Sequence, residues 1–535
     1  MSFTRPGLGP RQKAIARQLA LLTLLCAITG AWSAFRGTDA NWDLRNYHLY
    51  AGHAWMQGRL GFDIAPAQMQ TYFNPLHSLP YFWLVTAWGD HPRLVAFAMG
   101  VPAGLYAFAL AQIAWIAARR ALGPGLLALA AAGVATLLGM SGAGVRPLIG
   151  STMGDVAFAG PIMLALWLAL RSAEAPAPRT AWRWRSMLAT GLLCGAATGL
   201  KLTNVIYAAP LGLLVLLMFG LRAALVAGGA MALAFLAFWG PHALALWREF
   251  GSPIFPMYND IFRSPDFTAA RIADERFLPR NWMQAVFYPF YWLRTTSGLV
   301  TELSMRDARG AVGFVSAALL AVGLLRPFPQ APGGRRPELL LLLFCVAAYA
   351  MWAKMFGIYR YLIVIESLAG VLLLLALGRF LVGRPGRVVA AHAAIAAGLA
   401  AFAVLPNWGT IRHPPAVIRF EPLPVPPGAL LLLTADDALA YVVPFLPPDV
   451  RAIGVRSNLV RPGEEHGLAR RIRAAIAGHD GPIWAIGDPR ITPASIADAL
   501  QPHGLALGPC QLVRSTLVRE GHAFCEVLRT APLGG

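Results

Sequence analysis

The densest group of side chains able to do chemistry follows the first long apolar run, in a polar stretch at about residues 36–93. It combines acids, amides, phenols and imidazoles: Asp39, Asn41, Asp43, Arg45, Asn46, Tyr47, His48, Asp63, Tyr72, Asn74 and His77. If residues 41–57 form a helix, Asp43, Asn46, Tyr47 and Tyr50 share one face at i, i+3, i+4 and i+7. That face suits a sugar or a hydroxyl acceptor. The alternative is an interfacial helix whose Trp and Tyr side chains lie at headgroup level.

The composition indicates that membrane helices position this stretch. Of the 535 residues, 57% are hydrophobic and 13% are charged, whereas a soluble domain carries about 25% charged residues. Apolar runs recur from Leu19 to Leu405, and their lengths of about 15–25 residues match a bilayer of roughly 30 Å. The first run, residues 15–35, lacks a convincing small-residue cleavage site, so we interpret it as a retained helix.

The distribution of charge explains the formal charge of +19 without a nucleic-acid partner. The last 130 residues hold 12 Arg and 11 acidic residues and are nearly neutral. The excess lies in short clusters between apolar runs: Arg5, Arg11, Lys13 and Arg17; Arg119 and Arg120; Arg171, Arg179, Arg183 and Arg185; Arg326, Arg335 and Arg336; Arg379, Arg384 and Arg387. Such clusters mark cytoplasmic loops. We therefore expect the lipid bilayer, and no nucleic acid, as a partner.

A cytoplasmic N-terminus places every cluster on the cytoplasmic side. The expected spans are about 15–35, 94–118, 121–141, 154–171, 186–200, 203–220, 222–246, 310–326, 338–353, 361–378 and 388–405. Long loops at 36–93 and 247–309 and the tail from residue 406 then lie in the periplasm of a bacterial inner membrane. Residues 76–88 are apolar but short, and we interpret them as a re-entrant or interfacial piece. The sequence predicts an all-α polytopic domain, residues 1–405, with about 11 to 13 transmembrane helices.

The tail, residues 406–535, is expected to be a separate small α/β domain. Strand-like segments at 429–434, 450–455 and 482–486 alternate with helix-like segments at 436–445, 464–478 and 493–500. Cys510 and Cys525 lie in two further strand-like segments, and in an oxidising periplasm they can form a disulfide. The alternative is two buried thiols. The other cysteines, Cys26, Cys194 and Cys345, lie inside apolar helices, where we expect them to pack.

Several short motifs resemble the GT-C superfamily of membrane glycosyltransferases. An aspartate follows the first helix, and an aromatic-rich loop then contains Phe73-Asn74-Pro75-Leu76. Gly199-Leu200-Lys201-Leu202-Thr203-Asn204, the GSPIFPMYNDIF segment at 251–262 and Tyr359-Arg360-Tyr361 are also similar to that superfamily. The resemblance covers roughly residues 15–405, and the tail matches no family.

The resemblance implies an inverting enzyme that moves a sugar from a polyprenyl-phosphate donor to a cell-surface glycan, lipid or protein outside the cytoplasm. Its first-loop aspartate is the general base, a position that falls on Asp43. A carboxylate suits this role, because the attacking hydroxyl must lose its proton. Asn46, Tyr47, His48 and Asn74 are the candidate substrate-binding residues of this loop.

The leaving lipid phosphate needs fixed cations or donors, and the chain has only three lysines. Lys201, with Asn204 nearby, and Arg360, flanked by Tyr359 and Tyr361, are the candidates for this role. Arg can bind phosphate through two parallel hydrogen bonds. The alternative for Lys354 and Arg360 is snorkelling at a helix end.

Asp155 and Arg146 lie at the outer end of an expected span. Asp155 is a candidate for binding a hydroxyl or assisting Asp43, and it is equally suited to capping a helix. Arg146 is a candidate partner for Asp155 or for phosphate. His48 and His77 do not have metal-ligand spacing, and the first loop lacks a paired-acid motif. A divalent metal is thus unsupported by any motif, and no cofactor is assigned.

Two other functions share parts of this pattern. A membrane transporter also has about a dozen helices with embedded charges. Such proteins usually show two halves with a similar helix pattern, and this sequence shows no such repeat. An O-antigen-type ligase or polymerase uses a lipid-linked donor but transfers a whole glycan, and the sequence separates it poorly from a transferase of a single hexose or pentose.

Overall fold

The computed structural model describes residues 9–174, 180–325, 334, 336–461, 463–488 and 493–530. The chain folds into two compact units, each built from several segments. The helical unit comprises Met1–Phe35, Phe97–Phe238 and Asp274–Trp408, and the sheet unit comprises Arg36–Ala96, Trp239–Ala273 and Gly409–Gly535. Four residues of the basic clusters, Arg5, Arg179, Arg326 and Arg335, lie outside the described residues.

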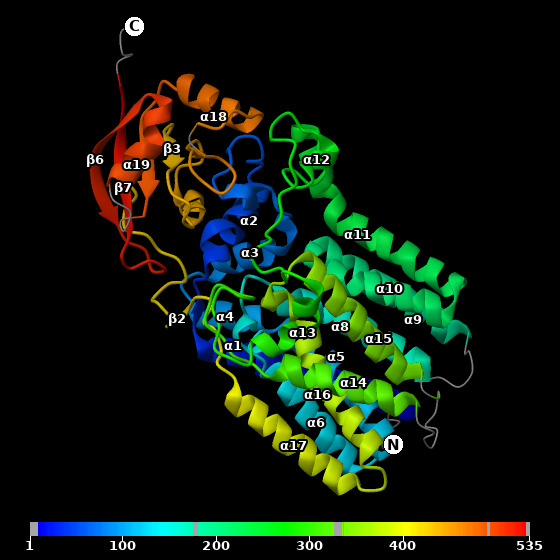
Figure 1. Cartoon of the computed structure of the whole chain (residues 1–535). Helices are drawn as coiled ribbons and strands as arrows, with labels where there is room; N and C mark the ends of the chain where they lie inside the picture. The colour runs from blue at the N-terminus through cyan, green and yellow to red at the C-terminus, as the bar shows by residue number, and fades with distance from the viewer. Residues whose placement is uncertain are drawn as a thin grey trace, which may run out of the picture. The chain divides into compact units, whose positions relative to one another are not determined.

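The helical unit consists mainly of apolar helices of different lengths (Figure 1). They are α1 Pro10–Arg36, α5 Ala103–Leu122, α6 Leu126–Met140, α7 Val145–Leu148, α8 Asp155–Glu174, α9 Thr180–Leu200, α10 Val205–Phe219, α13 Trp282–Tyr291, α14 Arg309–Leu325, α15 Arg336–Met355, α16 Ile363–Phe380 and α17 Pro385–Phe402. The 3₁₀ turns Leu202–Asn204 and Tyr359–Leu362 precede α10 and α16. Helices α4 Pro92–Gly100 and α11 Leu221–Phe250 contribute residues to both units.

Helices lie at every expected span, with α4 and α5 sharing the span at 94–118, which confirms the expected polytopic helical fold. Among the described residues, eight helices are long and apolar enough to cross a membrane: Pro10–Arg36, Pro92–Leu122, Asp155–Glu174, Leu202–Phe219, Leu221–Phe250, Arg336–Met355, Tyr359–Phe380 and Pro385–Phe402. Helices α6 and α14 are apolar but shorter. The chain is thus a multi-pass membrane protein by the length and composition of its helices. Which terminus faces which side stays a prediction.

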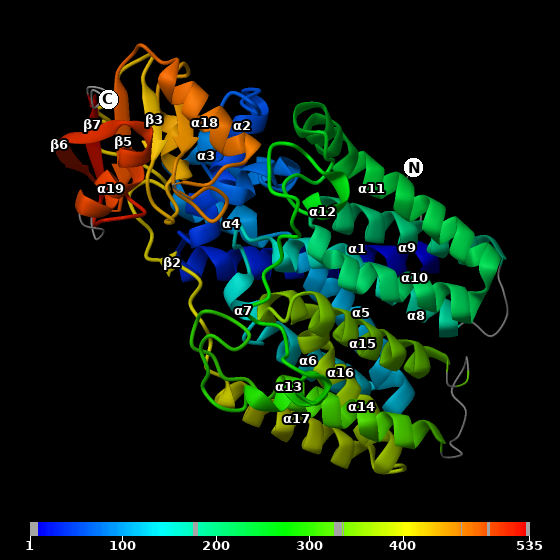
Figure 2. The same cartoon turned by 45° about the horizontal axis from the view of Figure 1, so that its top comes forward.

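Helix α16 forms the centre of the helical unit. It packs against α5, α6, α14, α15 and α17, and Figure 2 shows α14, α15 and α16 side by side. Its side chains are apolar and buried almost all round, as expected for a helix enclosed by other helices. The residues at its N-terminal end are therefore enclosed by neighbouring helices.

Three glycines bring helices α9 and α11 into backbone contact. Gly191, Gly195 and Gly199 recur every fourth residue, and a Cβ at Gly191 or Gly195 would lie 2.1 or 2.2 Å from the carbonyl oxygen of Ala227 or Met231. Small residues at this spacing are typical of close helix packing in membranes. The packing fixes the C-terminal end of α9, which leads directly into Lys201.

The sheet unit contains a five-stranded sheet in the order β4-β3-β5-β7-β6. Its strands are β3 Leu430–Leu433, β4 Arg451–Gly454, β5 Ile483–Gly487, β6 Leu505–Val513 and β7 His522–Arg529. Strands β3, β4 and β5 are parallel, and β7 and β6 run antiparallel to their neighbours. Helices α18 Gly467–Ala477 and α19 Pro493–Leu500 accompany them. The expected α/β fold of the tail is confirmed.

One expected helix of the tail is shorter than the sequence suggests. A 3₁₀ helix covers Ala440–Phe445, whereas we expected a helix from Asp436. The side chain of Asp437 accepts a hydrogen bond from the Ala438 N–H, and the carbonyls of Asp436 and Asp437 accept the Gln68 side chain. These bonds hold the bend at residues 435–437.

The sheet unit joins the tail to segments far away in the sequence. Strand β1, Thr38–Asp39, pairs with β2, Thr410–Ile411. Helices α2 Leu49–Met56, α3 Leu79–Trp88 and α12 Asn259–Phe262 belong to the same unit. At the other side of the first loop, Ile64 bridges to Ile453 of β4. The tail and the first loop are thus one folded body.

Helix α3 settles the nature of the short apolar segment at 76–88. It has ten residues, and at about 1.5 Å per residue it measures roughly 15 Å, about half of a bilayer core. It is therefore too short to cross the membrane.

A buried ion pair fixes the first loop to strand β4. The Arg59 Nε lies 2.7 Å from Asp63 Oδ2, with side chains 6% and 0% exposed. Arg59 also donates to the carbonyls of Pro448 and Val450, and Asp63 accepts the Ala452 N–H at 2.9 Å. Every polar atom of this pair therefore has a partner in the tail or in the loop.

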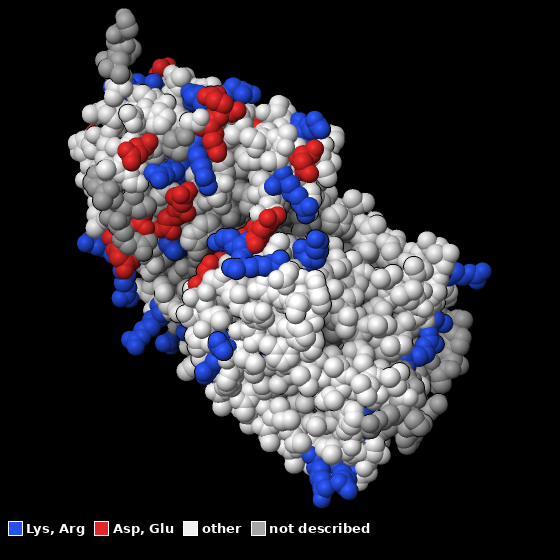
Figure 3. All heavy atoms as spheres, in the orientation of Figure 1, with Lys and Arg blue, Asp and Glu red and all other residues white. Residues whose placement is uncertain are grey.

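Charged side chains are distributed differently over the two units. In Figure 3 the visible surface of the helices is broadly uncharged, with Lys and Arg near their ends, whereas both signs of charge gather over the sheet unit. A broad uncharged belt is the surface that a bilayer requires.

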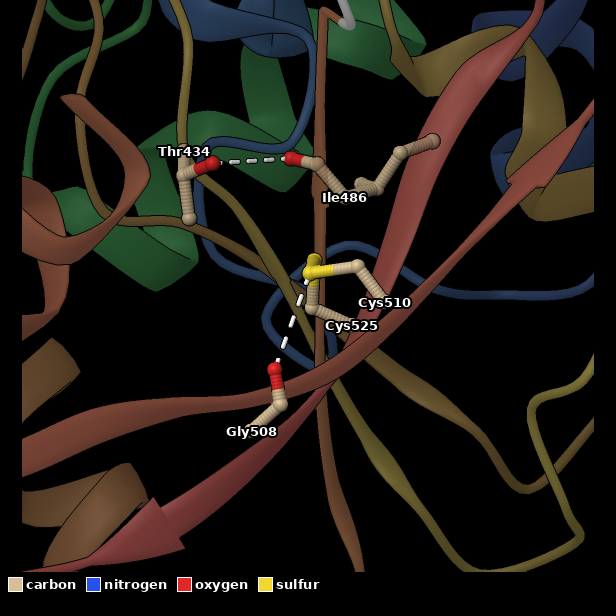
Figure 4. Close-up of a disulfide and its surroundings, with 5 residues drawn as sticks. All are labelled: Thr434, Ile486, Gly508, Cys510 and Cys525. Atoms are coloured by element: carbon tan, nitrogen blue, oxygen red, sulfur yellow. Dashed lines mark hydrogen bonds between the residues drawn. A yellow bond between two sulfur atoms is a disulfide. The ribbon is translucent and has the colours of Figure 1, made fainter. Parts of the chain in front are cut away.

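A disulfide joins Cys510 of β6 to Cys525 of β7, which are paired directly across the two strands (Figure 4). Cys26, Cys194 and Cys345 are free thiols. The bridge closes the β6–β7 hairpin near the C-terminal end of the described chain.

Replacing Arg59 with Met should destabilise the sheet unit by about 3–5 kcal/mol, because it leaves the Asp63 carboxylate buried without its cation. Arg419→Met is the matched control, since the Arg419–Asp90 pair is 62% and 74% exposed and such pairs contribute about 0–1 kcal/mol. Chemical denaturation followed by limited proteolysis of the tail measures both. Equal stability of the two variants contradicts this role for Arg59.

Cys510→Ser should lower the free energy of unfolding of the sheet unit by about 3 kcal/mol, the value for a bridge that closes a loop of this length; the sequence separation is 15 residues. Thiol titration of the denatured wild-type protein should find three thiols before reduction and five after. Five thiols without reduction would rule out the bridge.

Candidate functional site

The first candidate group lies on a helix that begins just before Asp43. The helix starts at Trp42, has π geometry over Leu44–His48 and continues as α2. The Asn41 side chain caps it by accepting the Leu44 N–H at 2.7 Å. Asp39 lies in β1 and binds the Asn41 amide, so it is not one helical turn before Asp43. Asp43 occupies the first turn and makes no capping hydrogen bond.

The π turn changes the face expected for residues 41–57. An added residue in the turn rotates Tyr50 relative to Asp43. The Tyr50 hydroxyl donates to Asp63 Oδ2 at 3.0 Å, and burial together with the Asp63 charge raises the pKa of Tyr50 well above its usual value. Tyr50 therefore supports the fold of the loop as a protonated donor.

The other candidates of the first loop are mostly buried. Asn46 donates to the Ala67 carbonyl, and Asn74 caps a 3₁₀ turn by accepting the Leu76 N–H. The centres of the Tyr47 and His48 rings lie 4.0 Å apart, and the ring planes are tilted by 36°. His48 Nδ1 lies 3.0 Å from Ser78 Oγ and 3.1 Å from His77 Nε2. The structure thus brings Tyr47, His48 and His77 together, and the two asparagines fix the backbone.

The second candidate group lies in the helical unit, where α8 begins and α9 ends. Lys201 Nζ lies 2.5 Å from Asp155 Oδ1 and donates to the Met153 carbonyl at 2.7 Å. Its ammonium also lies 5.5 Å from the centre of the Tyr361 ring. Asp155, the first residue of α8, is therefore the counter-ion of Lys201.

Arg360 lies on the same tyrosine. Its guanidinium is 5.2 Å from the centre of the Tyr361 ring, and the Tyr207 hydroxyl donates to the Tyr361 carbonyl. Lys201 and Arg360 are both half-buried. Two cations around one aromatic ring, with one carboxylate beside them, form a group suited to binding an anion.

The remaining candidates of the helical unit occupy different surroundings. Arg146 is exposed, with its guanidinium 4.8 Å from the centre of the Trp32 ring. The Asn204 amide donates to the Ala197 carbonyl at 3.0 Å and fixes the turn after Lys201. Tyr359 is buried, and its hydroxyl donates to Glu366. Lys354 is exposed at the end of α15, as expected of a snorkelling residue.

Sequence reasoning missed the acidic residues that surround these candidates. Asp307 and Glu366 are buried in the helical unit and bind the turn before Arg146. The pKa of Asp274 is lowered by its hydrogen bond from Arg276 and, to a lesser extent, by the charge of Arg360, so the loop before α13 lies near Arg360. The one available signal was an acid at position 366 inside an otherwise apolar run.

Within the described residues, no three His, Cys, Asp or Glu side chains come together as metal ligands.

Comparisons with known proteins bear on the fold. No family model and no curated protein matches the chain. A solved structure, ArnT from Cupriavidus metallidurans bound to undecaprenyl phosphate, is similar with a TM-score of 0.50 and 12% sequence identity over 98% of this chain and 99% of that chain. The chain therefore has a fold similar to that of this structure, and the similarity extends through the tail.

Replacing Lys201 with Met should destabilise the helical unit by about 3–5 kcal/mol, because the Asp155 carboxylate stays buried without its cation. Adding Asp155→Asn should recover part of the loss, since the two residues form one pair. Thermal unfolding in detergent measures both variants, with Lys354→Met as the exposed control. If the single variant is as stable as the double variant, the pair is not coupled.

Proposed function

We propose that the chain is an inverting glycosyltransferase that moves a sugar from a polyprenyl-phosphate donor to a cell-surface glycan, lipid or protein on the periplasmic face of the inner membrane. The observation that carries the proposal is the group of Lys201, Arg360 and Asp155 around Tyr361, in a chain whose fold is similar along its whole length to that of ArnT bound to undecaprenyl phosphate.

The proposed reaction is a single displacement. An acceptor hydroxyl oxygen attacks the anomeric carbon, the bond from that carbon to the phosphate oxygen breaks, and the configuration inverts. Asp43 accepts the hydroxyl proton. The bond electrons stay on the phosphate, which leaves as a polyprenyl phosphate monoester.

The cations act on the leaving group. A phosphodiester carries one negative charge, and the monoester that forms approaches about −2 near pH 7. Groups that bind the added charge lower the barrier, since they bind the transition state better than the donor. Lys201 and Arg360 are the residues assigned to this role. Asp155 orients the Lys201 ammonium through the 2.5 Å contact.

The first loop would bind the acceptor. The Tyr47 and His48 rings are in contact and lie beside His77, and apolar ring faces with polar edges suit a sugar. Asn46 and Asn74 bind backbone groups, so their contribution is to hold the loop that carries Asp43.

Asp43→Asn should lower the rate of sugar transfer by about 10²–10⁴-fold, the usual contribution of a general base. The assay is transfer from a polyprenyl-phosphate-linked sugar by the purified protein, with membrane insertion followed by fractionation. Asp90→Asn is the control, because Asp90 is an exposed acid of the same unit. Transfer by the Asp43 variant at the control rate would remove Asp43 as the base.

The mass of the product separates the proposal from its alternative. A single added hexose or pentose supports a transferase, and an added oligosaccharide supports a ligase or polymerase.

A further inference from the structure

Glu366 is a carboxylate enclosed by the helical unit, in the first turn of α16. It is 3% exposed, and both of its oxygens accept hydrogen bonds. Gly144 N–H lies 3.0 Å from Oε1 and 3.2 Å from Oε2, Val145 N–H lies 3.1 Å from Oε2, and the Tyr359 hydroxyl lies 2.9 Å from Oε1. One side chain therefore binds two segments that are more than 200 residues apart in sequence.

A second buried carboxylate binds the same turn. Asp307 Oδ2 accepts the Ala143 N–H at 3.0 Å and lies 2.7 Å from Arg309 Nη1. Arg309 in turn donates to the carbonyl and the hydroxyl of Ser141. Side chains thus bind the backbone of four of the five residues in the turn: Ser141, Ala143, Gly144 and Val145.

Each of the two bound segments is followed directly by an arginine. Arg146 follows Val145 directly and is exposed over Trp32. Arg360 follows Tyr359 directly and lies over Tyr361. The bonds to Glu366 therefore set the backbone direction at both arginines.

The glycine in the turn is required by this arrangement. A Cβ on Gly144 would lie 2.8 Å from Glu366 Oε2 and 3.1 Å from Ile363 Cγ2. Only a residue without a side chain lets the backbone approach the carboxylate so closely.

We propose that Glu366 is a positioning residue that fixes Arg146 and Arg360 relative to each other, so that both bind the phosphate of the lipid-linked donor. This inference rests on the proposed function. A buried carboxylate is costly unless its oxygens are fully hydrogen-bonded, and Glu366 meets that condition through donors from the two segments alone. Directional hydrogen bonds to a charged group constrain a backbone more tightly than apolar contacts do.

The test compares two buried glutamates of the helical unit. Glu338 is 4% exposed and binds Arg120 and Arg379, so Glu338→Gln also removes a buried charge, but away from the two arginines. The full-length protein in detergent micelles is titrated with undecaprenyl phosphate, and with undecaprenol as the phosphate-free probe. Hydrogen exchange of residues 142–146 is followed in each variant.

Glu366→Gln should raise the Kd for undecaprenyl phosphate by about tenfold, because an amide offers N–H where the turn needs an acceptor, and one misplaced charged contact is of this size. Exchange at 142–146 should speed up, and binding of undecaprenol should not change. Glu338→Gln should change the Kd by less than about twofold. Tyr359→Phe, which removes one of the bonds to Glu366 and keeps the carboxylate, should weaken binding by a smaller factor.

Three results would each overturn the proposal, in different ways. If the wild-type protein binds undecaprenyl phosphate no better than undecaprenol, the proposed donor is wrong and the role of Glu366 falls with it. If the wild type binds but both glutamate variants lose affinity equally, the donor stands and Glu366 only stabilises the bundle. If Glu366→Gln does not fold, Tyr359→Phe decides, and an unchanged Kd in that variant overturns the proposal.

Discussion

The cost of taking a charge out of water governs this structure. A carboxylate or ammonium among apolar helices is tolerated only when it is paired or fully hydrogen-bonded. In the helical unit this condition is met by Asp155 with Lys201, by Asp307 with Arg309 and by Glu338 with Arg120. The Asp155–Lys201 and Glu338–Arg120 pairs join segments that are distant in the sequence, whereas the Asp307–Arg309 pair is local and binds the turn at 141–143. Turns between the helices therefore lie where charged side chains can bind their backbone groups.

The same condition explains why the chemistry gathers in turns. Helices satisfy their own backbone, whereas a turn between apolar helices must bind its N–H and carbonyl groups to side chains. Residues 141–145 do so through Asp307, Arg309 and Glu366. In the sheet unit, Asp63 and Arg59 serve the backbone of the tail in the same way. Because charged groups fix the backbone of such a turn, the position of the side chain that follows the turn is fixed as well.

The sequence predicts the elements well and the pairings poorly, for physical reasons. Apolar runs predict the helices, and alternating strand-like and helix-like segments predict the α/β fold of the tail, because these signals are local in the sequence. The union of Asp63 with Ala452 and the contact of Glu366 with Gly144 join residues hundreds of positions apart, and no local pattern encodes them. The π turn at Leu44–His48 is likewise not predicted, because the interpretation of the sequence assumes a constant α-helical period. Of the candidate residues, Asp155, Lys201 and Arg360 are brought together around Tyr361, while their roles stay predictions.

The pairing of Lys201 with Asp155 has a consequence for anion binding. Together the two side chains carry no net charge, so the ammonium attracts a distant phosphate weakly but offers a fixed donor at short range. Arg360 lies over the same ring, with its guanidinium 5.2 Å from the ring centre. In the proposed reaction, negative charge grows on the phosphate as the bond breaks, so a fixed ammonium at Lys201 would bind the transition state more strongly than the donor, which is the condition for catalysis rather than for tight binding of the donor.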